Sequence, residues 1–96
     1  MSVSNAHVKT ENAGSYLRKL CQHWSHRFPV EYDAQHGTIH LPQAACVLHA
    51  SPDELTIRLD LQQGADEARL RQVVEEHIER FAFREELTFL WTSTSA

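Results

Sequence analysis

The chain has 96 residues, of which 42% are hydrophobic and 23% charged, with three glycines and three prolines. This length and composition suit one globular domain and exclude a disordered tail or a fibrous repeat. Nine basic and thirteen acidic residues give a net charge of −4, which disfavours non-specific nucleic-acid binding because that binding needs a basic surface.

The first predicted elements are a strand at residues 6–10 and an amphipathic helix at residues 12–28. Apolar side chains spaced three and four apart form one helical stripe, which contains Leu17, Leu20, Cys21, Trp24 and Phe28. The opposite face is basic and consists of Arg18, Lys19, Gln22, His23, His26 and Arg27. We therefore expect Trp24 to be buried and His26 to face solvent.

Residues 30–61 are predicted to form strands joined by turns, because apolar and polar side chains alternate. The first turn is expected at residues 34–37, and Gly37 belongs to it. Turn lengths predict three apolar cross-strand pairs: Tyr32 with Ile39, Ile39 with Cys46, and Leu48 with Ile57. The other face of the sheet is then a mixed polar surface of Thr38, His40, Val47, His49, Thr56, Arg58 and Asp60.

A second helix is predicted at residues 65–82 and a last strand at residues 87–91, with a frayed tail at residues 92–96. Leu87, Phe89 and Trp91 are expected to face inward. The element order is β-α-β-β-β-β-α-β. It predicts an α+β two-layer sandwich, in which two helices cover one face of a mostly antiparallel sheet. The whole chain, 1–96, is expected to be a single domain with an ordered core at about 6–91.

Two segments of the sequence resemble the signature blocks of one bacterial family. Residues 20–28 (LCQHWSHRF) and 80–89 (RFAFREELTF) are similar to the blocks of domain of unknown function 2218, with mild departures at Gln22 and Arg27. The resemblance covers about residues 6–91. It implies a small bacterial cytosolic protein without an established activity. Some members resemble domains attached to, or encoded beside, siderophore-interacting flavin reductases, which implies a link to iron acquisition.

Seven histidines are the unusual feature of the composition. His23 and His26 lie three apart on the exposed helix face, so they can share a metal ion or an anion if a third ligand approaches. No third ligand is evident, and neither HEXXH nor CxxC spacing is present. No cofactor is therefore predicted, and iron or zinc at His23 and His26 stays an alternative to two ordinary surface histidines.

Three other histidines are expected near the outer face of the sheet. His40 and His49 lie on that face, and His36 lies in the turn beside the strand of His49. Weak metal chelation, a pH-sensitive surface and a plain solvated face are all compatible with this cluster.

Four residues are predicted to bind a ligand: His23, His26, Arg27 and Arg84. Together they would form a basic pocket for a small anion such as a carboxylate or a catecholate. The alternative is that Arg84 joins Arg80, Glu85 and Glu86 in an ion-pair cluster that fixes the turn after the second helix.

His77 falls on the apolar stripe of the second helix, where a polar ring needs a hydrogen-bond partner. It is either a satisfied core histidine or a base paired with Glu85, Glu86 or Cys21. Cys21 and Cys46 lack disulfide or zinc spacing and are expected to be reduced thiols.

These observations favour a cytoplasmic, non-enzymatic binding or accessory module. Its expected partner is a small anionic ligand or a protein of a siderophore pathway, with no nucleic acid and no membrane. The chain lacks both a signal-peptide pattern and an apolar run long enough to cross a bilayer. The alternatives are a small enzyme that uses His77 with a carboxylate, and a self-associating protein whose interface includes Val47 and Thr56. The protein is expected to be a monomer or a homodimer.

Overall fold

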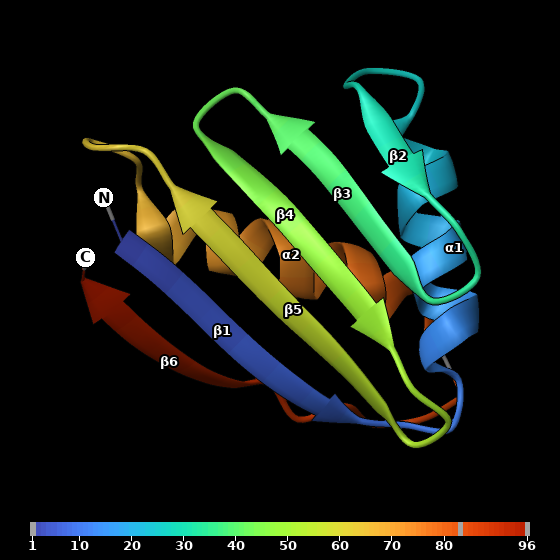
Figure 1. The fold of residues 1–96 in the computed structure, drawn as a ribbon. Helices are drawn as coiled ribbons and strands as arrows, with labels where there is room; N and C mark the ends of the chain where they lie inside the picture. The colour runs from blue at the N-terminus through green and yellow to red at the C-terminus, as the bar shows by residue number, and fades with distance from the viewer. Residues whose placement is uncertain (1, 83, 96) are drawn as a thin grey trace.

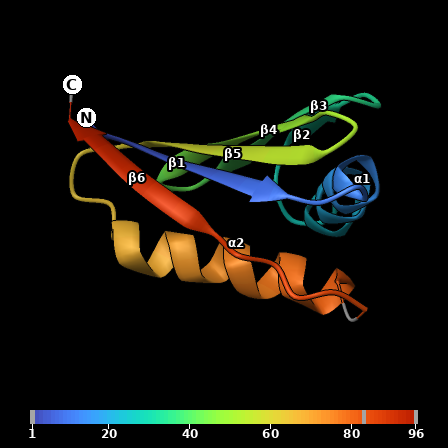
Figure 2. The same cartoon turned by 90° about the horizontal axis from the view of Figure 1, so that it is seen from below.

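One six-stranded antiparallel sheet carries both helices on the same face (Figures 1 and 2). The computed structural model describes residues 2–82 and 84–95. The elements are β1 (Ser2–Lys9), α1 (Ala13–Trp24), β2 (Val30–Tyr32), β3 (His36–Leu41), β4 (Ala44–Ala50), β5 (Glu54–Leu61), α2 (Glu67–Phe81) and β6 (Leu90–Ser95). The predicted α+β class and element order are confirmed. Phe83 and Ala96, in the predicted connection and tail, lie outside the described residues, as does Met1.

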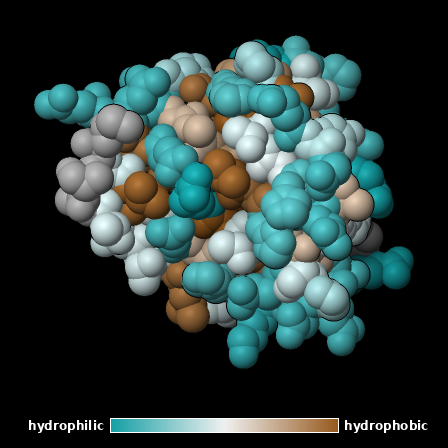
Figure 3. Space-filling view, in the orientation of Figure 1, coloured by the Kyte–Doolittle hydropathy of each residue, from teal (hydrophilic) through white to brown (hydrophobic). Residues whose placement is uncertain are grey.

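The strands lie in the order β2-β3-β4-β5-β1-β6, so the first strand is internal and the last strand forms an edge. Every pair is antiparallel. The inner face of the sheet packs against the helices, and the outer face carries mostly hydrophilic side chains around smaller hydrophobic areas (Figure 3).

The apolar stripe of α1 is buried against the sheet, as the sequence pattern predicts. Leu17, Leu20 and Cys21 are fully buried and Trp24 is 4% exposed, whereas His26 is exposed. The helix ends at Trp24, four residues before the predicted end. Phe28 precedes a proline, which disfavours helical backbone there. Its N–H still donates to the carbonyl of Trp24, four residues earlier, and this bond closes a turn after the helix.

The first hairpin has a register that differs from the predicted one. Val30 lies opposite Ile39, and Tyr32 lies opposite Gly37 rather than Ile39. The Asp33 carboxylate accepts hydrogen bonds from the backbone N–H groups two and three residues ahead, each at 2.8 Å. These bonds tighten the turn to two residues instead of four. The other two predicted pairs, in the β3–β4 and β4–β5 ladders, are confirmed.

Gly37 is a packing residue and not a turn residue. It is buried in β3 beneath α1, and the described residue with a positive φ is Gly64, at 86°. A Cβ at Gly37 would lie 2.7 Å from the Cys21 sulfur and 3.5 Å from Leu17 Cδ2. The missing side chain therefore allows α1 to approach β3 closely.

The second helix is less deeply buried than the first. Asp66 caps its N-terminus by accepting a hydrogen bond from the Arg69 N–H at 3.1 Å. Val74 and Ile78 are fully buried, but His77 and Phe81 on the same stripe are half-buried. One flank of the stripe thus stays accessible beside α1.

The last strand begins later than predicted, at Leu90 instead of residue 87. Leu87, Phe89 and Trp91 pack against the core, as expected, but the first two lie in an irregular segment. Residues 92–95 are not a frayed tail, because they pair with β1. This part of the strand has no large apolar side chain, so hydrophobic alternation gave no signal for it.

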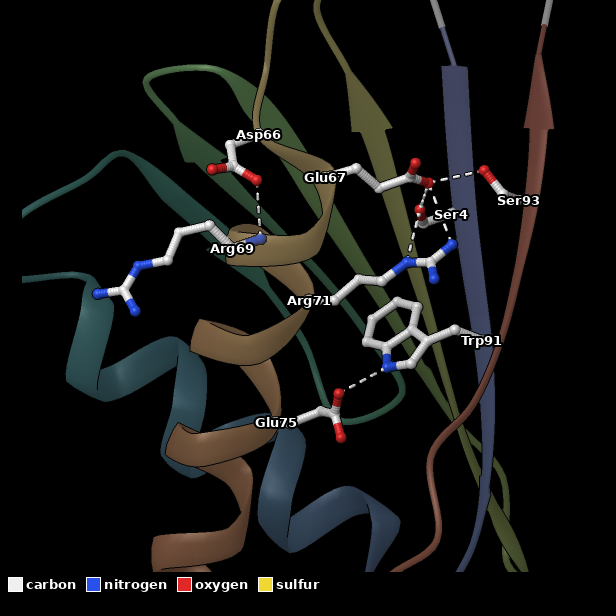
Figure 4. Close-up of polar contacts among 8 residues, drawn as sticks. All are labelled: Ser4, Asp66, Glu67, Arg69, Arg71, Glu75, Trp91 and Ser93. Carbon is white, nitrogen blue, oxygen red and sulfur yellow. Dashed lines mark hydrogen bonds and ion pairs between the residues drawn. The ribbon is translucent and has the colours of Figure 1, made fainter.

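A carboxylate on α2 joins that helix to β1 and β6 (Figure 4). Glu67 accepts hydrogen bonds from the fully buried Ser4 hydroxyl and from the Ser93 hydroxyl, the latter at 2.7 Å. Arg71 donates to Glu67 and to the Ser4 oxygen, each at 3.1 Å. These bonds, led by those from Ser4 and Ser93, hold the pKa of Glu67 below its ordinary value of 4.5.

Trp91 on β6 completes this junction. Its indole N–H donates to Glu75 on α2 at 3.0 Å, and the Arg71 guanidinium carbon lies 5.4 Å from the ring centroid, in range for a cation–π contact. The edge strand is therefore attached to α2 by polar contacts as well as by the sheet.

Replacing Gly37 tests the close approach of α1. We expect Gly37→Ala to lower the free energy of unfolding by about 1–3 kcal/mol, because the added methyl group overpacks the Cys21 sulfur. Urea denaturation measures the change. The matched control is Gly14→Ala on α1, where a Cβ would meet nothing nearer than the Ala34 carbonyl oxygen at 3.8 Å. This control should leave stability unchanged or slightly raised, and equal losses in both variants would contradict the packing role.

Glu67 makes stability depend on pH. Because its folded-state pKa is lowered from the ordinary value of 4.5, its contribution to stability is present above that ordinary value and is lost as the pH falls through the folded-state pKa. We expect Glu67→Gln to flatten the loss of stability in acid, measured by thermal unfolding at several pH values below 5. Ser93→Ala, which removes one donor, should flatten it partly. An acid profile of Glu67→Gln identical to wild type would count against this network.

Candidate functional site

The four predicted ligand-binding residues occupy different parts of the surface. His23 lies in the last turn of α1 and faces α2, while His26 and Arg27 lie exposed in the turn that follows the helix. Arg84 lies after α2 and lines a cavity between the two helices. The structure thus places Arg84 beside α1, but the lining of that cavity includes none of His23, His26 and Arg27.

This cavity has a volume of about 230 Å³. Its wall comes from one side of α1, where residues three and four apart lie above one another, and from the end of α2 with the segment after it. The lining residues are Asn12, Ser15, Tyr16, Lys19, Phe81, Arg84 and Glu85. Two cations, one carboxylate and two aromatic rings therefore meet in a small space.

The carboxylate in the cavity is held by two donors. Glu85 accepts hydrogen bonds from the Thr10 hydroxyl at 2.6 Å and the Asn12 amide at 2.7 Å, and Tyr16 lines the same cavity. The bond from Thr10 contributes most to lowering the pKa of Glu85. Burial, followed by the charge of Glu85, raises the pKa of Tyr16. Glu85 is thus a fixed, hydrogen-bonded anion that ties the C-terminal end of β1 to the segment after α2.

Next to the cavity, a row of rings fills the seam between the helices. The His77 ring lies 5.0 Å from the Trp24 ring and 5.3 Å from the His23 ring, measured between centroids. The His23 ring also contacts Phe81, with centroids 6.4 Å apart. Because Phe81 lines the cavity and His23 lies one helical turn beyond Lys19, this seam continues the cavity wall.

The hydrogen bond of His77 goes to the backbone. Its Nδ1 lies 2.7 Å from the Val73 carbonyl oxygen, and a carbonyl can only accept, so Nδ1 carries the proton. The ion pairs formed by the described residues leave His77 without a carboxylate partner. The proposed pairing of His77 with Glu85, Glu86 or Cys21 is therefore not the arrangement seen, and His77 is a satisfied, half-buried histidine.

Neither thiol is placed for nucleophilic chemistry. Cys21 and Cys46 are both buried and unpaired with each other as a disulfide. Burial raises the pKa of Cys21 to about 11 and that of Cys46 to about 12. Thiols with such pKa values are protonated and unreactive at neutral pH.

The two histidines of the predicted metal pair, His23 and His26, have different surroundings. The His23 ring lies against His77 and Phe81, whereas His26 follows the end of the helix. Over residues 2–82 and 84–95, no group of three or more histidine, cysteine, aspartate or glutamate residues is positioned to hold a metal ion.

Comparison with known protein families identifies the family of this chain. The model of DUF2218, described as an uncharacterized protein conserved in bacteria, matches residues 5–92. The chain belongs to this family. The resemblance seen in the two sequence blocks of DUF2218 is thereby confirmed, and the family description names no activity.

A solved structure supports the same fold. The NMR structure of PA4090 from Pseudomonas aeruginosa shares 37% sequence identity with the chain, covers 96% of each chain and superimposes with a TM-score of 0.76. Comparison with curated proteins gave no match. The helices of the described residues are too short or too polar to cross a membrane.

Sequence reasoning missed five of the seven residues that line the cavity, namely Asn12, Ser15, Tyr16, Lys19 and Phe81. Lys19 was assigned only to a solvated basic face, while Tyr16 and Phe81 received no site role. The signal available was the helical spacing of Tyr16, Lys19 and His23, which places them along one edge of α1. The spacing does not tell which segment covers this edge, because the covering residues lie more than 50 positions away in the sequence.

Thiol reactivity tests the assignment of both cysteines as inert. At pH 8 a thiol with a pKa of about 11 is ionised in roughly one molecule in a thousand. We expect the folded protein to react with Ellman's reagent only at the rate of its unfolding, and both thiols to react at once in denaturant. Rapid modification of one thiol in the folded state would reopen a nucleophilic role.

Proposed function

We propose that the protein is a non-enzymatic binding module that holds a small anionic ligand in the cavity between α1 and the segment after α2. One observation supports this function above the others: Lys19 and Arg84 line the same small cavity beside the aromatic ring of Phe81. Two cations against the single carboxylate of Glu85 leave a formal charge of 2 − 1 = +1 in the lining.

Glu85 is already hydrogen-bonded within the protein, which favours an anionic ligand over a cationic one. Each oxygen of this carboxylate already accepts one hydrogen bond, from Thr10 or Asn12, so about half of its roughly four lone-pair sites are occupied by the protein. The ammonium group of Lys19 enters no ion pair among residues 2–82 and 84–95. A ligand carboxylate or phenolate would therefore find a donor in Lys19 and further positive charge from Arg84.

The volume of the cavity and the aromatic ring of Phe81 in its lining favour a small aromatic acid, or the acidic end of a longer molecule, as the ligand. A volume of about 230 Å³ is below the roughly 300–1,000 Å³ of pockets that enclose drug-sized ligands. Phe81 and the adjoining His23 offer ring faces on which an aromatic acid can stack. A catecholate satisfies both requirements, which keeps the link to siderophore handling in a cytoplasmic protein within this proposal.

Titration with defined acids tests the function. We expect 2,3-dihydroxybenzoate to shift the backbone amide resonances of Lys19, Phe81 and Arg84 saturably, and acetate to do so more weakly because it lacks a ring. Lys19→Glu should weaken dihydroxybenzoate binding about tenfold or more, because it replaces an attractive charge with a repulsive one.

The matched control is Arg69→Glu, which makes the same change in net charge at an exposed position of α2 outside the cavity lining. Its affinity should equal that of the wild type. Equal weakening in both variants would indicate a general charge effect. Shifts confined to the outer sheet face would show that the cavity is not the binding site.

A further inference from the structure

The outer face of the sheet carries a histidine pair that the proposed function does not use. His36 on β3 lies directly opposite His49 on β4. The neighbouring Ala50 N–H donates to the Gln35 carbonyl at 2.8 Å, which makes that neighbour the hydrogen-bonded pair of the ladder. His36 and His49 are then a non-hydrogen-bonded pair, the class in which facing side chains come closest.

The two rings are separated by a distance suitable for sharing one metal ion. Their centroids are 4.6 Å apart, with planes tilted by 46°. A metal–nitrogen bond of about 2.0–2.1 Å and an angle of about 90–110° at the metal place two imidazole centres roughly 4.5–5.2 Å apart. Both residues are exposed, so small side-chain rotations can aim one nitrogen of each ring at a common point, and water can complete the coordination.

We infer that His36 and His49 form a two-imidazole binding site for a late first-row divalent metal ion on the helix-free face of the sheet. Imidazole nitrogen suits copper, nickel and zinc, and affinity at a given nitrogen site peaks at Cu²⁺. Cu²⁺ is therefore expected to bind most tightly, ahead of Zn²⁺ and Ni²⁺. The strands hold both ligands in place before the metal arrives, so the second imidazole binds as an intramolecular ligand.

A carboxylate beside His36 favours a cation at this pair. Asp33 lies across the β2–β3 turn from His36, with its Oδ1 3.7 Å from His36 Nδ1. Its carboxylate accepts two backbone hydrogen bonds and adds a negative charge beside the metal position. Thr56, the next residue across the sheet after His49, is uncharged.

The other histidines are less suited to the same role. His40 is on the same face, but it lies opposite Ala45 and contacts Glu31 at 2.7 Å. His23 and His77 are a second ring pair, with centroids 5.3 Å apart. That separation is slightly above the range for one shared metal ion, and His77 is half-buried in the seam between the helices.

Calorimetric titration of the untagged protein with Cu²⁺ tests the site. We expect one ion per chain, and His36→Ala and His49→Ala should each weaken its binding about tenfold or more, because each leaves a single imidazole. His40→Ala is the matched control on the same strand and should bind as the wild type does. The unfolding temperature should rise with Cu²⁺ in the wild type and in His40→Ala, and less in His36→Ala and His49→Ala. Circular dichroism confirms that the exposed alanine variants fold.

Two results would overturn this assignment. One is Cu²⁺ affinity that is unchanged in both His36→Ala and His49→Ala. The other is a loss of affinity that appears in His23→Ala but not in these two variants, which would move the ion to the helical seam. Either result leaves the anion-binding proposal intact, because that proposal rests on Lys19 and Arg84.

Discussion

The close packing of α1 on β3 is the constraint on which the rest of the structure depends. Gly37 lets the helix lie so near the strand that Cys21 and Leu17 occupy the space of a missing side chain. At that depth one edge of α1, with Lys19 and His23, stays at the surface and faces the end of α2. The cavity therefore follows from how deeply the helix is seated.

Two carboxylates complete this arrangement by holding α2 along β1. Glu67, in the first turn of α2, bonds Ser4 near the start of β1, and Glu85, beyond the end of α2, bonds Thr10 just after that strand. The helix is thus attached at both ends to the same strand, although only Val74 and Ile78 of α2 are fully buried. Polar contacts compensate for a thin apolar interface, and the half-buried seam beside α1 is the part left accessible.

The periodic spacing of apolar residues predicts those structural features that depend on the local sequence. The stripe of α1, the inward face of the strands and the element order are readable because burial selects apolar side chains at fixed spacing. The predicted register of the first hairpin was wrong, because hydrogen bonds to the Asp33 carboxylate, rather than apolar pairing, set the observed register. The candidate site could be predicted only in part. Arg84 and His23 have functional side chains that can be recognised in the sequence. That Arg84 and Lys19 line the same cavity depends on how distant segments pack together, which the sequence pattern does not show.

The strand order has a consequence for how the chain is made. β1 is synthesised first, yet both of its neighbours in the sheet, β5 and β6, come much later in the sequence. During translation the hairpins of β2 to β5 can form between residues that are close in sequence. Both edges of β1 stay unpaired until β5 and β6 have been synthesised. Folds dominated by such distant pairings acquire their native contacts slowly, and an unpaired strand is a template for aggregation meanwhile. The serine and asparagine side chains of β1 give that waiting strand a more polar character than its position inside the sheet would suggest.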